Sequence, residues 1–367
     1  MPDRPPGRIV QVVTQREPAG AQRVAHQLHR AFVAEGVPSE VLFLYRRADA
    51  YDDEPYLDLS TRRPGPIGTL RLLVELVRRW RADRPAAVIA HTFHASVLAA
   101  LAGTAARVPR RVAVHHVLAP FERGARRGVL RLLAATPLVH HHVYVSQTTL
   151  DSYGAAARRR SVVIRNGVDD PAPAGPWAPP RRCPGAPLVV AVGRLAPQKD
   201  HATLLAALEQ LPDVELLVLG EGELRPALEA DVAARGLAGR VTLLGNVPAE
   251  HVPAALAAAD VVVQPSVWEA YSMVVLEAMA AGRPMVVSDI PAHREALGSH
   301  ARYHPVGDAA ALAAAVRALL DDPTEARALG EGARQAARAH SHAEVARRYL
   351  ALVGLGVDAG APVGGGR

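Results

Sequence analysis

The feature that most constrains the fold is an alternation of strand and helix patterns that runs through the first half of the chain, stops, and starts again. Short apolar runs such as residues 8–13 and 87–90 are separated by segments with helical spacing, such as residues 21–35. After residue 187 the pattern restarts with the apolar run Leu188–Val192. This alternation predicts an α/β fold of two doubly wound parallel sheets, facing each other across a cleft where ligands bind.

Proline density separates the two halves. Residues 169–187 contain seven prolines, which is typical of an interdomain linker. We therefore expect an N-terminal domain over residues 1–168 and a second domain over residues 188–340. A last helix over residues 341–353 is expected to pack back toward the N-terminal domain, and the glycine-rich residues 354–367 to form a flexible tail.

Composition excludes several classes of protein. The chain has 367 residues, 49% of them hydrophobic and 21% charged, as in soluble globular proteins. A single cysteine, Cys183, excludes an internal disulfide framework and a cysteine-based zinc site, and it agrees with a reducing cytoplasm. The polar start is unlike a signal peptide, and no run of 18 apolar residues is present, so we expect a cytoplasmic location.

Charge is divided unevenly between the halves. Residues 1–168 hold 25 arginines and 13 acidic residues, a net charge of +12, whereas the remainder carries −6. The basic half predicts an anionic partner or peripheral contact with an anionic membrane, while solvated arginines that serve no partner are the alternative. With 4% aromatic residues the stacking platforms of a nucleic-acid binder are sparse, so no nucleic acid is expected, and an arginine-rich nucleic-acid-binding protein is the weaker alternative. Two features motivate the anionic partner, an apolar helix face within residues 70–80 that is flanked by arginines, and the cluster Arg123, Arg126, Arg127 and Arg131.

Residues 266–287, SVWEAYSMVVLEAMAAGRPMVV, concentrate the rare residue types of the chain. The pattern predicts a loop, a helix from about Ser272 that ends at Gly282, and a short strand. Glu269 precedes the helix and Glu277 lies inside it, and the helix N-terminus suits a phosphate. We expect both glutamates around one cavity there. The alternative is that Glu269 is only a favourable first-turn charge and Glu277 a solvated helix residue.

A second group of charged residues follows the first strand of the second half. Gly193-Arg194-Leu195 ends that strand, and Lys199, five positions after Arg194, is the only lysine of the chain. The glycine lets the backbone approach a ligand closely, the arginine offers a forked contact and the lysine a point charge, and together they fit a diphosphate. The alternative is that Arg194 and Lys199 are two solvated cations. The P-loop pattern is absent.

Two asparagine turns and several histidines complete the candidates. Asn166-Gly167-Val168-Asp169 closes the first half, and Gly245-Asn246-Val247 follows a strand, so each is a ligand contact or simply a turn. Metal-binding spacings are missing among the histidines, and no metal site is expected. In the predicted strand over residues 111–116, His116 ends the strand and points to the face opposite His115.

Together these residues resemble the family 4 glycosyltransferases, retaining enzymes with two facing Rossmann-like domains. The resemblance covers roughly residues 8–352. Its specific part is the glutamate pair with its flanks, from Pro265-Ser266 through Glu269 and Glu277-Ala278-Met279-Ala280 to Gly282-Arg283-Pro284. The weaker parts are Gly193-Arg194-Leu195 with Lys199, Gly220-Glu221-Gly222 and Asn166-Gly167-Val168-Asp169.

The resemblance implies transfer of a sugar from a nucleotide-diphosphate-sugar, with retention of anomeric configuration and without a metal or other cofactor. Glu277 would hold the ribose hydroxyls, Glu269 the hydroxyls of the transferred sugar, and Arg194 and Lys199 the leaving diphosphate. His116 would lie beside the sugar, with His115 as the alternative. The donor-binding set implied in this way is Gly193, Arg194, Lys199, Asn246, Val247, Glu269, Tyr271, Ser272, Met273 and Glu277. The catalytic set is His116, Glu269, Arg194 and Lys199, and the acceptor-side set is Gly20 and His116.

The acceptor class stays open at this point. A cell-envelope glycan or a lipid-linked intermediate agrees with the basic first half, and a small soluble metabolite is the alternative. A glycosidase would also use two glutamates, but it leaves Arg194 and Lys199 without a role. The chain departs from the family pattern at Ala19-Gly20 and at Asp289-Ile290-Pro291-Ala292, where glycine pairs are frequent.

Overall fold

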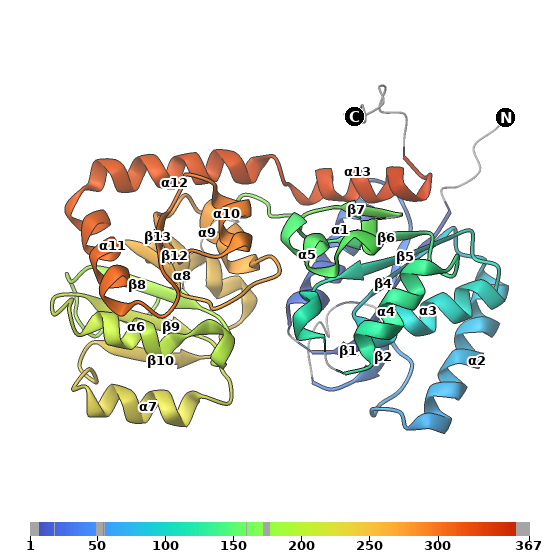
Figure 1. Cartoon of the computed structure of the whole chain (residues 1–367), viewed down its shortest axis with the longest axis horizontal. Coiled ribbons are helices and arrows are strands. Elements are labelled where there is room, and N and C mark those ends of the chain that lie inside the picture. Colours follow the sequence, from blue (N-terminus) through green and yellow to red (C-terminus); the bar gives the residue numbers. More distant parts are fainter. Residues whose placement is uncertain are drawn as a thin grey trace. The chain divides into compact units, whose positions relative to one another are not determined.

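The chain forms two compact units in the computed structural model (Figure 1). The N-terminal unit comprises Met1–Gly167 and His342–Arg367, and the C-terminal unit comprises Val168–Ser341. The structure describes residues 7–17, 19–48, 54, 56–122, 124–158, 160–171 and 177–356. Arg123, part of the predicted linker and most of the predicted tail therefore lie outside the described residues.

The described part of the N-terminal unit is built on one parallel sheet of seven strands, in the order β3-β2-β1-β4-β5-β6-β7. The inner strands are nearly continuous apolar runs because helices cover both faces of such a sheet. The strands are β1 (Ile9–Arg16), β2 (Ser39–Arg46), β3 (Leu57–Asp58), β4 (Ala87–His91), β5 (Arg110–His115), β6 (His141–Tyr144) and β7 (Ser161–Val163). The helices are α1 (Gly20–Ala34), α2 (Pro66–Asp83), α3 (Phe93–Ala105), α4 (Arg126–Ala135), α5 (Gln147–Tyr153) and α13 (His342–Val353), with the 3₁₀ turns η1 (Ala119–Phe121) and η2 (Ala155–Arg158).

The last helix, α13, packs on α1 within the N-terminal unit. Tyr349 meets Phe32 edge to face with ring centroids 6.4 Å apart, and both rings are buried. At the rim, Arg347 forms an ion pair of 3.0 Å with Glu35. The chain therefore returns to its first unit after building the second.

Helix α2 buries only part of the face that the sequence predicted, since of Leu70, Leu73, Val74, Val77 and Trp80 only Leu73, Val77 and Trp80 pack at the core. Leu72, Leu76 and Trp80 are its buried residues, at a spacing of four. By contrast Leu70 and Val74, which we had placed on the apolar face, are 61% and 51% exposed. They continue an exposed row that starts at Ile67, which is 72% exposed. We call Ile67, Leu70 and Val74 the α2 apolar stripe.

The C-terminal unit contains a parallel sheet of six strands, in the order β10-β9-β8-β11-β12-β13. Its core fills the space between this sheet and the helices, largely with leucine, valine and alanine. The strands are β8 (Leu188–Val192), β9 (Glu215–Leu219), β10 (Val241–Gly245), β11 (Val261–Gln264), β12 (Met285–Ser288) and β13 (Arg302–His304). The helices are α6 (His201–Leu208), α7 (Arg225–Ala234), α8 (Val252–Ala258), α9 (Met273–Ala280), α10 (Pro291–Leu297), α11 (Ala309–Asp321) and α12 (Pro323–Arg338), with the 3₁₀ turns η3 (Pro197–Lys199) and η4 (Ala249–His251).

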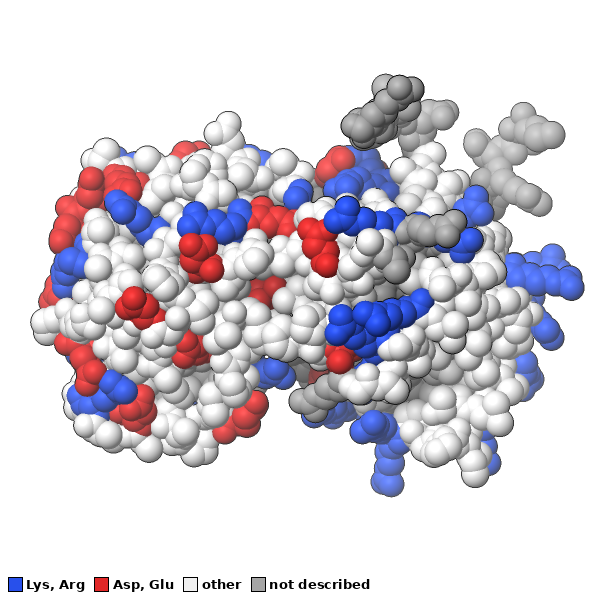
Figure 2. All heavy atoms as spheres, in the orientation of Figure 1, with Lys and Arg blue, Asp and Glu red and all other residues white. Residues whose placement is uncertain are grey.

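Two parallel-sheet Rossmann-like domains are therefore present, as the sequence predicted. Figure 2 shows arginines gathered over the N-terminal unit on the face in view, whereas most acidic side chains lie over the C-terminal unit. Within the described residues, no helix has both the length and the apolar character needed to cross a membrane.

Candidate active site

Four loops of the C-terminal unit carry most of the predicted donor-binding residues, and all four follow strands of the same parallel sheet. Gly193 follows β8, Gly220 follows β9, Asn246 follows β10, and the loop with Glu269 follows β11. Because the carboxyl ends of parallel strands meet at one edge of the sheet, the fold brings these loops to a common edge.

The glycine turns have a packing reason at this edge. A Cβ atom at Gly220 would lie 2.0 Å from the carbonyl oxygen of Gly193, and one at Gly222 would lie 2.2 Å from that of Leu195. The Leu195 N–H donates to the Glu221 carbonyl at 2.9 Å, which ties the two loops together. Only glycine admits such an approach, so Gly220-Glu221-Gly222 acts as a support for the loop that holds Arg194.

Glu269 and Lys199 form the central ion pair of the site. Lys199 Nζ lies 2.6 Å from Glu269 Oε1, and the two side chains are 15% and 9% exposed. Ser266 Oγ donates to the same oxygen at 2.8 Å, and Gln198 Nε2 donates to Oε2 at 3.3 Å. Burial disfavours the charged carboxylate, but the Lys199 ammonium and the hydrogen bonds from Lys199 and Ser266 outweigh it and lower the pKa of Glu269. Glu269 is therefore a carboxylate held in one orientation.

A buried polar layer behind this pair was not singled out from the sequence. Gln264 Nε2 donates to Ser266 Oγ at 2.9 Å, and His293 Nδ1 lies 2.9 Å from the Ser288 carbonyl oxygen. Burial is the main cause that lowers the pKa of His293 to about 4, so its ring is neutral near pH 7. Through Ser266, which donates to Glu269, this layer helps to hold the Glu269 side chain in place. Gln264 and Ser288 end strands and His293 lies in α10, and no sequence pattern distinguishes them from other polar residues.

Helix α9 begins beside Glu269. Its N-cap residue Ser272 is buried and accepts a hydrogen bond of 3.4 Å from the Val275 N–H. Among the described residues, the N–H groups of Met273 and Val274 donate to no protein acceptor, so they are available to an anion. Glu277 lies one turn further along α9 and is half-buried.

The other predicted donor-binding residues differ in exposure. Tyr271 is buried directly before α9. Arg194 is exposed and forms no ion pair within the part of the chain that the structure describes. Asn246 is exposed and Val247 is half-buried, both next to the edge strand β10.

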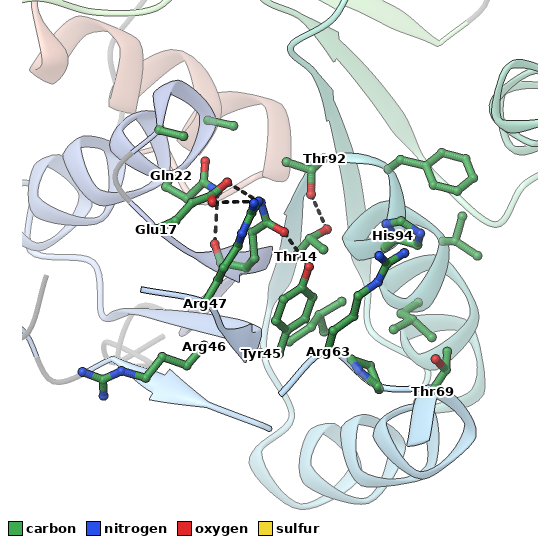
Figure 3. Close-up of a pocket in the computed structure, with 18 of the residues that line it drawn as sticks. Thr14, Glu17, Gln22, Tyr45, Arg46, Arg47, Arg63, Thr69, Thr92 and His94 are labelled. Carbon is green, nitrogen blue, oxygen red and sulfur yellow. Dashed lines mark hydrogen bonds and ion pairs between the residues drawn. The ribbon is translucent and has the colours of Figure 1, made fainter. Parts of the chain in front are cut away.

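A cavity of about 1150 Å³ lies within the N-terminal unit, at the carboxyl ends of its central strands (Figure 3). Gly20 and His116, the two predicted acceptor-side residues, both line it. Thr14 and Thr92 meet across its floor through a hydrogen bond of 2.5 Å between their hydroxyl oxygens. Tyr45 donates from its hydroxyl to Gln15 Oε1, also at 2.5 Å.

Strand β5 ends at His115, one residue earlier than predicted, and the two neighbouring histidines point to different sides. His116 lines the cavity, whereas His115 is buried against Tyr144 with ring centroids 4.4 Å apart. His115 Nε2 also lies 3.0 Å from His142 Nδ1. Of the two alternatives, His116 is therefore the histidine that a ligand in the cavity can contact.

His116 is backed by a short chain of polar groups. Its Nε2 lies 3.1 Å from His91 Nδ1, and His91 Nε2 lies 3.1 Å from Gln11 Oε1. Because Gln11 Oε1 only accepts, His91 carries its proton on Nε2, and His116 then donates from Nε2 to His91 Nδ1. Burial lowers the pKa of His116 to about 4. The neutral ring thus keeps the lone pair of Nδ1 for a ligand hydroxyl.

No group of three or more histidine, cysteine, aspartate or glutamate side chains that could hold a metal ion occurs among the described residues. Four histidines of the N-terminal unit form the stacked pairs His91–His116 and His115–His142.

Comparison with solved structures agrees with the fold. HepE of Anabaena, in complex with UDP and glucose, superposes with a TM-score of 0.80 at 20% identity, covering 95% of this chain and 99% of that one. At this identity the likeness shows the fold alone, a chain of two Rossmann-like domains.

Sequence comparison then gives the family. Residues 18–170 match the model "Glycosyltransferase Family 4" and residues 180–336 match "Glycosyl transferases group 1". The 2-deoxystreptamine glucosyltransferase of Streptomyces kanamyceticus is 31% identical in an alignment over 284 residues that covers 68% of this chain and 71% of that protein. The chain belongs to the family 4 glycosyltransferases.

Two further relatives match over shorter segments. The alpha-D-kanosaminyltransferase of Streptomyces kanamyceticus is 30% identical over 201 residues, 53% of this chain and 48% of that protein. The phosphatidyl-myo-inositol mannosyltransferase of Mycolicibacterium smegmatis is 38% identical over 174 residues, 44% of each chain. The chain thus spans about half the length of these two relatives.

Proposed function

We propose that this protein transfers a sugar from a nucleotide-diphosphate-sugar to an acceptor hydroxyl, with retention of anomeric configuration and without a metal ion. The observation that carries the proposal is the ion pair between Lys199 and Glu269, which joins the loop that holds exposed Arg194 to the loop that leads into α9. Two cations and the N–H groups at a helix start are the groups that stabilise a leaving diphosphate.

In this reaction the bond between the anomeric carbon and the diphosphate oxygen breaks, and its electron pair goes to the diphosphate. Arg194 and Lys199 would offset the charge that develops there, which is why the proposal needs no metal. The acceptor hydroxyl oxygen forms the new bond, and its proton goes to the departing diphosphate oxygen. Both carboxylate oxygens of Glu269 already accept hydrogen bonds, from Lys199, Ser266 and Gln198. Such a carboxylate is better suited to orienting bound groups than to attacking the sugar.

The donor side is assigned to the C-terminal unit and the acceptor side to the cavity of the N-terminal unit. Glu277 would accept from the ribose hydroxyls, as the family resemblance implies. His116 would accept through Nδ1 from a hydroxyl in the cavity, because its Nε2 proton is committed to His91. The nucleotide-sugar is a co-substrate, and neither another cofactor nor nucleic acid enters the proposal.

The decisive test is a thermal-shift panel of nucleotides and nucleotide-sugars on the full chain, starting with UDP and UDP-glucose, which are bound to HepE in its solved structures. We expect one nucleotide to stabilise the protein and Glu277→Gln to reduce that shift. The matched control is Glu331→Gln, because Glu331 is 65% exposed on α12. If no nucleotide shifts the melting temperature, the proposed function is wrong.

Once a donor is known, two measurements test the finer statements. The anomeric proton signal of the product should keep the donor configuration, and turnover should survive EDTA. An inverted product would contradict retention, and loss of turnover that only a divalent cation restores would contradict metal independence.

A further inference from the structure

The lining of the cavity in the N-terminal unit is strongly basic. Five arginines face it, namely Arg46, Arg47, Arg62, Arg63 and Arg126, against one carboxylate, Glu17. Glu17 is already paired with Arg47 at 3.1 Å, and Arg46 lies 3.8 Å from Asp58 outside the cavity. Among the described residues, Arg62, Arg63 and Arg126 form no ion pair. The cavity therefore contains positive charge that the protein itself does not neutralise.

Arg63, His94 and Arg126 share one side of this cavity although they come from three different segments. Arg63 precedes α2, His94 lies in the first turn of α3, and Arg126 begins α4. The Arg126 guanidinium carbon lies 5.3 Å from the centre of the Phe93 ring, and His94 meets the same ring edge to face at 5.2 Å. Figure 3 shows the Arg63 guanidinium directed toward the His94 ring.

The electrostatic effect on His94 agrees with this geometry. Burial is the largest cause that lowers the pKa of His94, and the positive charges of Arg126 and Arg63 lower it further. Both guanidinium groups therefore act on the same imidazole. Burial raises the pKa of Glu122, and the positive charge of Arg126 opposes this only in part; among the described residues the two side chains form no ion pair.

The start of α3 adds hydrogen-bond donors on the same side. Thr92 precedes the helix with a φ angle of 75°, and its hydroxyl is anchored to Thr14. The Ala95 N–H donates to Thr14 Oγ1 at 3.3 Å, whereas the N–H groups of Phe93 and His94 donate to no acceptor among the described residues. The positive end of the helix dipole thus faces the arginine side chains.

We propose that Arg63, His94 and Arg126, with the first N–H groups of α3, form an anion subsite that binds a phosphate group of the acceptor. A single guanidinium fork satisfies a carboxylate, whereas donors that converge from three segments match the three oxygens and the charge of roughly −1.5 to −2 of a phosphate monoester. The phosphate belongs either to a lipid headgroup or to a soluble sugar phosphate. Only the assignment of this phosphate to the acceptor rests on the proposed function. Phosphate binding itself is tested independently of that function.

The experiment follows the C2–H proton signal of His94 by NMR in the full chain without any nucleotide. The signal is assigned by its loss in His94→Gln. Inorganic phosphate at constant ionic strength should raise the pKa of His94 by about one unit, since an anion beside the ring stabilises its charged form. Acetate should raise it less. Because His94 lines the cavity of the N-terminal unit, its signal reports on this subsite.

Variants connect the shift to the two arginines. Arg63→Gln and Arg126→Gln should each weaken phosphate binding at least about 10-fold, as expected for a lost charged hydrogen bond. Arg71→Gln is the matched control, because Arg71 is exposed on α2 and does not line the cavity. A His94 pKa that phosphate leaves unchanged in the wild-type chain would overturn the proposal, and so would an equal phosphate effect in all three arginine variants.

The source of the phosphate is distinguished by two further probes, glycerol 3-phosphate and short-chain phosphatidic acid. A response to the soluble probe alone assigns a sugar phosphate, and a stronger response to the lipid assigns a headgroup. Either result supports the subsite, whereas a response to neither overturns it. If no nucleotide stabilises the chain, the proposed function is refuted, but these titrations still decide whether the cavity binds phosphate.

Discussion

Replacing Lys199 by methionine isolates the energetics of the central ion pair. The substitution keeps the apolar stem and removes the charge, so it leaves the Glu269 carboxylate buried at 9% exposure without its cation. Removing one partner of a buried pair costs about 3–5 kcal/mol. For a domain of this size each kcal/mol lowers the melting temperature by about 2–4 °C, so we expect a loss of about 6–20 °C near pH 7.

The pH dependence gives the sign of the effect. In the wild-type protein the pKa of Glu269 is lowered, so the contribution of the pair is complete above the unfolded pKa of about 4.3 and is lost as the pH falls through the lower folded value. In Lys199→Met burial is no longer outweighed and raises that pKa. The variant then loses stability as the pH rises from about 4.3 through the raised value. The stability gap between the two proteins must widen from pH 5 to pH 8.

Scanning calorimetry on the full chain measures this gap. The matched control is Arg302→Met, which breaks the solvent-exposed pair of Arg302 with Glu325 and should cost at most about 1 kcal/mol. The double variant Lys199→Met with Glu269→Gln should recover most of the lost stability, because no buried charge remains. A gap that stays constant with pH, or a double variant no more stable than Lys199→Met, would refute the reasoning.

Three other predictions follow from the same structure. Glu277→Gln should weaken the stabilising nucleotide about 10–100-fold in calorimetric titration with little change in melting temperature, and an unchanged affinity would remove Glu277 from the donor site. Gly222→Ala should lower the melting temperature, because its Cβ would lie 2.2 Å from the Leu195 carbonyl oxygen. The control Gly239→Ala, which has open space around it, should not. Equal melting temperatures of the two variants would show that the two loops can move apart without loss of stability. Serine at the three positions of the α2 apolar stripe should reduce co-sedimentation with anionic vesicles about 10-fold or more, and wild-type chain that stays in the supernatant would end the predicted membrane contact.

The alternation of strands and helices could be predicted because buried parallel strands are short apolar runs, and β8, β9 and β11 are of this kind. The sequence did not predict helices α4 and α5, and for α5 the physical reason is clear. Helix α5 is seven residues long and reads QTTLDSY, with threonine and serine that favour a helix weakly, and it depends on the Ser146 cap and on tertiary contacts. Local propensity therefore does not show it.

The composition of the candidate site could be predicted better than its connections. Lys199 and Glu269 were identified as rare or strategically placed residues, but nothing in their spacing says that they touch, since 70 residues separate them. The same holds for Arg63, which was not singled out at all because it is one of many arginines. Only the fold shows that it shares a cavity with His94. Long-range pairing is decided by the whole topology, and one sequence carries no direct signal for it.

The two units differ in whether a carboxylate pairs with the cationic side chains of the candidate site, and this difference bears on the proposed reaction. In the C-terminal unit Glu269 compensates Lys199 at 2.6 Å, so the charge of that site is balanced before a donor arrives. A diphosphate would have to share Lys199 with Glu269, and the added cation that it meets is Arg194. In the N-terminal unit Arg63 and Arg126 have no carboxylate partner among the described residues. A preformed positive cavity attracts an anion over longer distances than a compensated pair does, and salt screens that attraction more strongly. Part of the basic charge that the sequence places in its first half therefore lies in the cavity assigned to the proposed acceptor.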